Sequence, residues 1–169
     1  VVIKASELAP VTLLEFAKLV EKSGIPKGVI NIITGLGEPC GKALTTHKLV
    51  ERIAFTGGPE TAKHIVKNSA ENLSEVSLEL GGKSPVVVFN DAEQENALNG
   101  ITAGIFGASG QSCIAGSRLY IQSKIYDEFL NKLVKKAEKI KLGAPMDKDT
   151  QMGPLNSFKQ LENIEKNIK

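Results

Sequence analysis

Strand-like and helix-like segments alternate along this chain of 169 residues, and the alternation limits the fold more than any other feature. Short runs of β-branched and apolar residues are each followed by a longer segment with helical spacing of its apolar positions. A parallel sheet needs such a crossover connection, usually a helix, between one strand and the next. The order of segments therefore predicts an α/β fold, in which helices cover parallel sheets.

The predicted elements follow from this pattern. We expect strands at 1–3, 29–34, 52–56, 76–80, 86–89 and 118–122, and helices at 10–23, 39–46, 59–70, 92–106 and 124–141. Three successive strand–helix units predict a mononucleotide-binding half-sheet of the Rossmann type. The stretch 143–154 is rich in Gly, Pro and Asp, which predicts a loop, and the segment 163–169 is polar.

The double glycine Gly81-Gly82 separates two groups of predicted elements. We take it as a domain junction, with one domain at 1–81 and a second at 82–169. The 21 basic and 19 acidic residues are spread along the chain, which gives no reason to expect nucleic acid or a membrane as partner. The first residues lack the pattern of a signal peptide, and two cysteines make no disulfide framework. We therefore expect a cytoplasmic protein.

Two glycine-rich turns compete as sites for the phosphates of a nucleotide. The first, 35–41, is a loosened dinucleotide fingerprint with one residue too many before its last glycine. In the second, 55–60, Pro59 suits a helix start, so free amides and the positive helix end would face an anion. An ordinary strand-to-helix turn explains each pattern as well.

Cys113 and Glu79 could supply a nucleophile and a base. A thiolate attacks a carbonyl carbon, and a carboxylate can take a proton from a thiol or from water. A lone cysteine is more often a small buried hydrophobic residue, so residue type alone does not decide its role. Cys40 has no neighbouring motif, and we expect it to be structural. His47 and His64 lack partners at metal-ligand spacing, so no metal site is expected.

The sequences around Glu79 and Cys113 are more specific than the two residues alone. Glu79 lies in 78–85 (LELGGKSP), and Cys113 lies 34 residues later in 110–118 (GQSCIAGSR). In this order and at this spacing, the two segments resemble the NAD(P)-dependent aldehyde dehydrogenase superfamily. The resemblance extends from the first residues of the chain to near the last.

The resemblance implies an aldehyde dehydrogenase-like fold, in which a Rossmann-type NAD-binding domain is followed by part of a second α/β catalytic domain. The segment 55–61 resembles the helix start that holds the pyrophosphate in that family. Lys4 and Glu7, otherwise a solvated ion pair, match the residues that hold the adenine ribose; the carboxylate favours NAD and leaves NADP open. The implied cofactor-binding residues are Lys4, Glu7, Gly37, Gly41, Phe55, Gly57, Gly58, Thr61, Leu80 and Gly81.

The resemblance also implies a reaction, the oxidation of an aldehyde to a carboxylic acid with NAD. Cys113 would add to the aldehyde as a thiohemiacetal, and hydride transfer to the nicotinamide would leave a thioester. Water activated by Glu79 would then release the acid. The backbone amide of Cys113 would donate to the oxyanion, and Arg118 is expected to be a structural residue near the site.

The sequence departs from the family pattern in several places. Gly58 stands where a serine that binds phosphate is usual, and Ala62 stands where a second glycine is usual. The family's upstream Pro-Trp-Asn segment, its second ribose-binding glutamate and its oligomerisation strands have no counterpart here. We therefore expect the chain to be part of a longer protein, a homodimer or homotetramer that acts on a small aldehyde.

Three other readings stay open at this point. An acylating semialdehyde dehydrogenase would pass the thioester to coenzyme A, although the presence of Glu79 argues for hydrolysis. A thiol hydrolase or acyltransferase would pair Cys113 with a histidine, and nothing marks His47 or His64 for that role. A non-catalytic protein could retain the scaffold alone.

Overall fold

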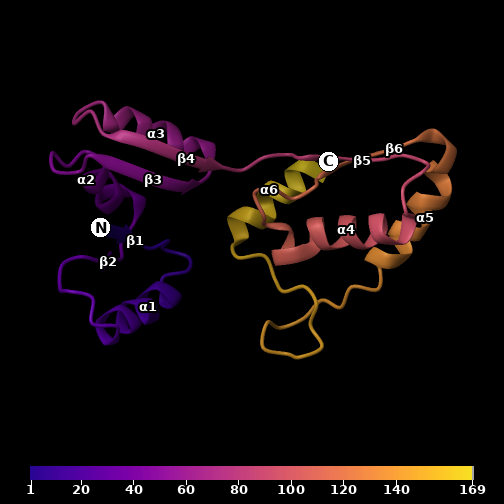
Figure 1. Cartoon of the computed structure of the whole chain (residues 1–169), viewed down its shortest axis with the longest axis horizontal. Helices are drawn as coiled ribbons and strands as arrows, with labels where there is room; N and C mark the ends of the chain where they lie inside the picture. Colours follow the sequence, from indigo (N-terminus) through magenta and orange to yellow (C-terminus); the bar gives the residue numbers. More distant parts are fainter. Residues whose placement is uncertain (169) are drawn as a thin grey trace. The chain divides into compact units, whose positions relative to one another are not determined.

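The computed structural model describes residues 1–168 and consists of two compact units, Val1–Leu80 and Gly81–Lys169 (Figure 1). The double glycine Gly81-Gly82 falls at the start of the second unit. The first unit contains β1 (Val2–Lys4), α1 (Val11–Lys22), β2 (Asn31–Ile33), the irregular turn η1 (Gly37–Gly41), α2 (Lys42–Thr45), β3 (Arg52–Gly57), α3 (Pro59–Ser69) and β4 (Glu75–Leu80). The second contains β5 (Pro85–Val88), α4 (Gln94–Phe106), the turn η2 (Gly107–Gly110), β6 (Arg118–Ile121), η3 (Ser123–Ile125), α5 (Tyr126–Ala137) and α6 (Phe158–Ile168).

The predicted α/β class is confirmed, because every strand pair is parallel and is connected through a helix. β1 pairs with β2, β3 with β4, and β5 with β6. The expected half-sheet of the first unit is wrong in one respect, since its four strands form two separate two-stranded sheets. β1 and β2 are three residues long and offer little edge for further pairing. A hydrogen bond from Asn68 to Thr45 links the helices α3 and α2.

The core of the second unit lies between the β5–β6 sheet and the helices α4 and α5. Phe129 of α5 is completely buried and packs with Val88, Leu98 and Ile101. Residues 125 and 133 also pack against the cluster. The buried positions of this segment therefore recur at helical spacing, as is typical of an amphipathic helix.

The helix α5 ends earlier than the predicted 141. Lys141 accepts hydrogen bonds at its carbonyl from the backbone N–H groups of Gln151 (2.9 Å) and Met152 (3.1 Å). Its own N–H donates to the side chain of Gln151 (2.9 Å). The backbone of Lys141 is thus bonded to the following loop and does not continue the helix, which ends at Ala137.

The helix α6 was not among the predicted helices, because polar residues make up most of the segment 163–169 and obscure the helical spacing. Ser157 caps it, with a hydrogen bond from the N–H of Gln160 to the Ser157 hydroxyl (3.2 Å). Phe158, Leu161 and Ile168 stand at helical spacing and were the available signal. None of the helices within residues 1–168 combines the length and apolar character needed to cross a membrane.

Replacing Phe129 by alanine tests how much the core of the second unit depends on this ring. Phe129 is 0% exposed, so Phe129→Ala should lower the free energy of unfolding by about 3–5 kcal/mol in urea titrations. Phe158→Ala is the matched control, because Phe158 is 86% exposed, and it should change the value by less than about 0.5 kcal/mol. Equal losses at both positions would show that the core is elsewhere.

Candidate functional site

The carboxyl edge of the β3–β4 sheet brings together several of the predicted residues. Thr56 pairs in register with Glu79, and Gly57 pairs with Leu80. Parallel strands end at the same edge, so the turn after β3 and the end of β4 are neighbours. Glu79 and Thr56 are both exposed, whereas Leu80 is half-buried on the other face of the strand. The carboxylate of Glu79 is thus open to solvent at this edge of the first unit.

The ring of Phe55 occupies the space that a side chain at Gly57 would need. The two residues are on the same face of β3, and the ring of Phe55 lies over Gly57. A Cβ atom added to Gly57 would come within 2.5 Å of the ring carbon Cζ. The ring and the glycine are thus packed together within the strand, and the predicted role of both residues in cofactor binding stays a prediction.

The start of α3 leaves two backbone N–H groups without partners in the helix. Gly58 precedes the helix in an extended conformation (φ −81°, ψ 152°), and Pro59 occupies the first helical position. The first helical hydrogen bond runs from the N–H of Ala62 to the carbonyl of Gly58 (3.1 Å). Helix geometry therefore leaves the N–H groups of Glu60 and Thr61 free to bind an anion. Nothing lies within 4 Å of a Cβ built on Gly58, so the approach is open.

Glu60 places a carboxylate in the first turn of α3, where it could compete with a bound anion. Its Oε1 lies 2.8 Å from the Nζ of Lys63, one turn further along the helix. The hydrogen bond and charge of Lys63 lower the pKa of Glu60. This exposed pair neutralises the carboxylate on the helix surface and leaves the amide end for another group.

Lys4, Glu7 and Gly41 also gather in the first unit. The Nζ of Lys4 lies 3.6 Å from Oε2 of Glu7 and donates to the carbonyl of Ala5 (3.0 Å). A hydrogen bond from its own backbone N–H lowers the pKa of Glu7, and Lys4 lowers it further. A Cβ built on Gly41 would lie 3.8 Å from the aliphatic part of Lys4, and one on Gly37 would meet nothing within 4 Å. The predicted lysine–glutamate pair is therefore present beside the first glycine turn.

Asn68 and Thr45 connect the two glycine turns, a role that sequence analysis missed. The Nδ2 of Asn68, on α3, donates to Oγ1 of Thr45 (2.9 Å), and Thr45 donates to the carbonyl of Gly41 (3.0 Å). The helix that begins at the second glycine turn is thus tied to the end of the first. A polar residue on a helix face gives little sequence signal for such a long-range bond.

Cys113 occupies an exposed turn in the second unit, between η2 and β6. The N–H of Ala115 donates to the carbonyl of Ser112 (3.2 Å), which closes a β-turn with Cys113 as its second residue. Cys113 is a free thiol and is exposed, while Ala115 behind it is 7% exposed. The other cysteine, Cys40, is half-buried with its side chain packed against Gly35, as expected of a structural residue.

The segment before β5 holds the turn of Cys113 in place. Arg118 donates from Nε to the carbonyl of Lys83 (2.8 Å) and from its backbone N–H to Ser84 (3.3 Å), which supports its predicted structural role. A Cβ built on Gly82 would lie 3.5 Å from the carbonyl oxygen of Cys113. The double-glycine segment and the cysteine turn therefore run side by side within the second unit.

The predicted site residues divide between the two units. Glu79 and Leu80 end the first unit, which also holds the other cofactor-binding positions up to residue 61. Gly81 and Cys113 belong to the second unit. Within residues 1–168 no three His, Cys, Asp or Glu side chains form a group that could hold a metal ion.

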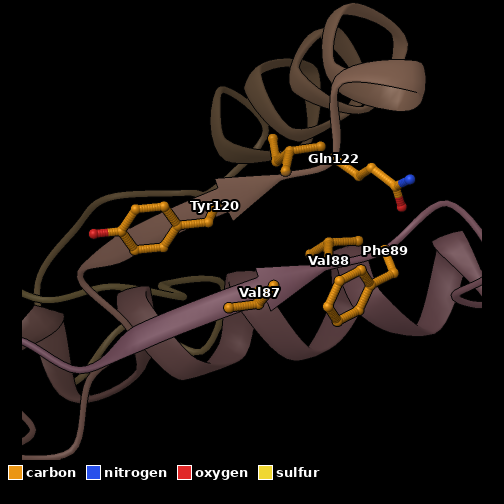
Figure 2. Close-up of a pocket in the computed structure, with 6 residues that line it drawn as sticks. Val87, Val88, Phe89, Tyr120 and Gln122 are labelled. Atoms are coloured by element: carbon orange, nitrogen blue, oxygen red, sulfur yellow. The ribbon is translucent and has the colours of Figure 1, made fainter.

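A separate hollow lies on the β5–β6 sheet and contains none of the predicted site residues. Figure 2 shows Val87 and Phe89 along one strand and Tyr120 along the next. Val87 and Tyr120 are partners in register, and the three side chains are 56%, 61% and 51% exposed. Strand alternation places Val87 on the face opposite the buried Val88. The phenol of Tyr120 is the one acid–base group among these three side chains, and the other two are apolar.

Comparison with known proteins gives consistent matches over the whole chain. The sequence model described as "Aldehyde dehydrogenase family" matches residues 1–169. A (Z)-2-((N-methylformamido)methylene)-5-hydroxybutyrolactone dehydrogenase from Acinetobacter baylyi is 59% identical, over 98% of this chain and 34% of the relative. The chain thus spans about a third of the length of that relative.

Two solved structures show the same similarity in three dimensions. The crystal structure of PnpE in complex with nicotinamide adenine dinucleotide matches with a TM-score of 0.96 and 45% identity, over 99% of this chain and 34% of that one. Betaine aldehyde dehydrogenase from Staphylococcus aureus in complex with NAD+ matches with a TM-score of 0.95 and 44% identity, over 99% and 33%.

The contact between Phe55 and Gly57 can be tested with two neighbouring glycines. Gly57→Ala must displace the ring of Phe55 and should lower the free energy of unfolding by about 1–3 kcal/mol. Gly58→Ala meets no atom within 4 Å and should change it by less than about 1 kcal/mol. Urea unfolding of both variants compares the two, and a larger loss for Gly58→Ala would contradict the packing described here.

Proposed function

The chain belongs to the aldehyde dehydrogenase family, and from this membership we propose that the full-length protein oxidises an aldehyde to a carboxylic acid with NAD. The observation that carries the proposal is the exposed thiol of Cys113, presented on a turn that contacts with Gly82, Lys83 and Ser84 hold in place. We assign residues 1–81 to an NAD-binding domain and 82–169 to part of a catalytic domain. Cys113 is the proposed nucleophile and Glu79 the proposed base.

The residues of the first unit fit a dinucleotide. The free N–H groups at the start of α3 and the open space at Gly58 suit a pyrophosphate. Lys4 and the ionised Glu7 suit the hydroxyl groups of a ribose, and the carboxylate disfavours a 2′-phosphate. Relatives with NAD bound match this chain closely, which supports NAD over NADP. When bound, NAD supplies the acceptor for a hydride.

The steps carried out by Cys113 follow from thiol chemistry. Its thiolate forms a bond to the aldehyde carbon, and the carbonyl electron pair moves onto oxygen. The N–H of Cys113 donates to that oxyanion. Loss of hydride from the same carbon leaves a thioester on Cys113. The exposure of Cys113 on its turn supports this addition, because a substrate can reach the sulfur from solvent.

Glu79 completes the reaction as a general base. Its carboxylate takes a proton from water, and the water oxygen adds to the thioester carbon. The carbon–sulfur bond then breaks, Cys113 leaves as a thiolate, and the carboxylic acid is released. The presence of Glu79 at the exposed end of β4 supports this hydrolytic route over transfer to coenzyme A.

The proposal also covers the substrate, the assembly and the location of the full-length protein. We infer a small aldehyde as its partner, a homodimer or homotetramer as its assembly, and the cytoplasm as its location. Both cysteines are free thiols, which is consistent with a reducing compartment.

The roles of Cys113 and Glu79 can be separated by kinetics of the full-length protein. NADH formation from NAD is followed by absorbance with a panel of aldehydes. Cys113→Ala should abolish it, because no thiohemiacetal can form. Glu79→Gln should give a burst of one NADH per site and then stop, since the thioester persists; mass spectrometry would detect the acylated Cys113.

Cys40→Ala is the matched control, because it removes the other cysteine of this chain, and it should retain activity. Full activity of Cys113→Ala would mean that the nucleophile is assigned wrongly. If Glu79→Gln turns over only when coenzyme A is added, the thioester still forms and only its hydrolysis is lost. That outcome would leave the assignment of Glu79 as the base intact. If the unmutated protein binds NAD and oxidises no aldehyde, with or without coenzyme A, the non-catalytic scaffold is favoured.

Gly58 offers a test of the pyrophosphate site. Gly58→Ser adds a hydroxyl beside the free amides of α3, and one further hydrogen bond should lower the Kd for NAD about fivefold. Gly58→Ala adds the same Cβ without the hydroxyl and should not tighten binding. Isothermal titration calorimetry measures both, and equal affinities for the two variants would place the phosphates elsewhere.

A further inference from the structure

We propose that Ser109 is a positioning residue for Cys113, acting through a hydrogen bond to the carbonyl of Gly153. The inference rests on the proposed function, because it takes Cys113 as the nucleophile. Ser109 stands four residues before Cys113. Its role follows from its own contacts in the second unit.

The backbone before Cys113 is held in an unusual conformation. Ala108 (φ 51°), Ser109 (φ 55°) and Gly110 (φ 71°) are three consecutive residues in the left-handed region. Glycine adopts this region freely, but alanine and serine do so at a cost in free energy. Such a turn persists only where surrounding contacts fix it.

Ser109 makes the contact that can fix the turn. Its Oγ donates to the carbonyl oxygen of Gly153 at 3.2 Å, across 44 residues of sequence, and its side chain is half-buried. A Cβ built on Gly153 would lie 3.8 Å from Oγ of Ser109 and 3.7 Å from Pro145. The side chain of Ser109 thus lies in ordinary van der Waals contact with the space beside Gly153, close to Pro145.

The acceptor itself is held by the loop 143–154. The N–H of Gly143 donates to the carbonyl of Met152 (3.2 Å), and Gln151 and Met152 bond back to Lys141. These bonds close the loop at its base, next to Gly153. The carbonyl of Gly153, which accepts the hydrogen bond from Ser109, therefore belongs to a loop that is itself held by hydrogen bonds.

The turn of Cys113 is consequently fixed from both directions. On its carboxyl side, Arg118 bonds to Lys83 and Ser84. On its amino side, the Ser109–Gly153 bond is the long-range contact, and only three residues separate Ser109 from the thiol. Without this bond the left-handed turn can relax, and the sulfur moves relative to the bound substrate.

The test compares Ser109→Ala and Ser109→Gly in the full-length protein. Both remove the hydroxyl, but only glycine relieves the left-handed strain. If the hydrogen bond positions Cys113, both variants should lose about 10- to 100-fold in kcat, because small misplacements of a reacting group are costly. The Kd for NAD should stay within about twofold, since Ser109 lies outside the cofactor-binding residues. Ser123→Ala, at an exposed serine of the same unit, should match the wild type.

Hydrogen exchange followed by mass spectrometry supplies a readout that needs no catalysis. Peptides covering 107–117 should exchange at least about fivefold faster in both variants, while those of α5 remain unchanged. Unchanged exchange in 107–117 would overturn the proposal, and so would wild-type kcat in Ser109→Gly. Full activity of Cys113→Ala would instead refute the proposed nucleophile, whatever the exchange shows.

Discussion

The parallel register of β5 and β6 fixes the position of Cys113, the candidate nucleophile, next to the double-glycine segment. Pro85 pairs with Arg118, so the segments that precede these two residues must also run side by side. One of these segments contains the double glycine and the other contains Cys113. The side chain and backbone of Arg118 then fasten them together. A buried ring, Phe129, holds the helices against this sheet and keeps the register from slipping.

The proposed base and the proposed nucleophile lie at different ends of the strands in their own sheets. Glu79 lies at the carboxyl edge of β3–β4, where glycine turns and helix starts supply free amides. Cys113 lies before the first residue of β6, at the amino edge of β5–β6. The first edge suits anion binding, whereas the second offers a thiol on a rigid turn. The proposed base and the proposed nucleophile therefore belong to different units.

Much of this arrangement could be predicted from sequence, because its signals are local. Helical spacing of apolar residues predicted the segment that contains α5, and Pro59 marked the start of α3, which the structure confirms. The motif around Cys113 gave the family, which the comparisons confirm. Features set by long-range contacts could not be predicted. The left-handed φ of Ala108, the Asn68–Thr45 bond and the early end of α5 all depend on residues far away in the chain.

The ring of Phe55 over Gly57 has a consequence for how such sequences can change. The two positions share one volume, so a Cβ at 57 would require the ring of Phe55 to move. The cost of a side chain at 57 therefore depends on the residue at 55, and it is higher beside the ring than beside a smaller side chain. Substitutions at the two positions are thus energetically coupled, and their effects on the free energy of unfolding should not add.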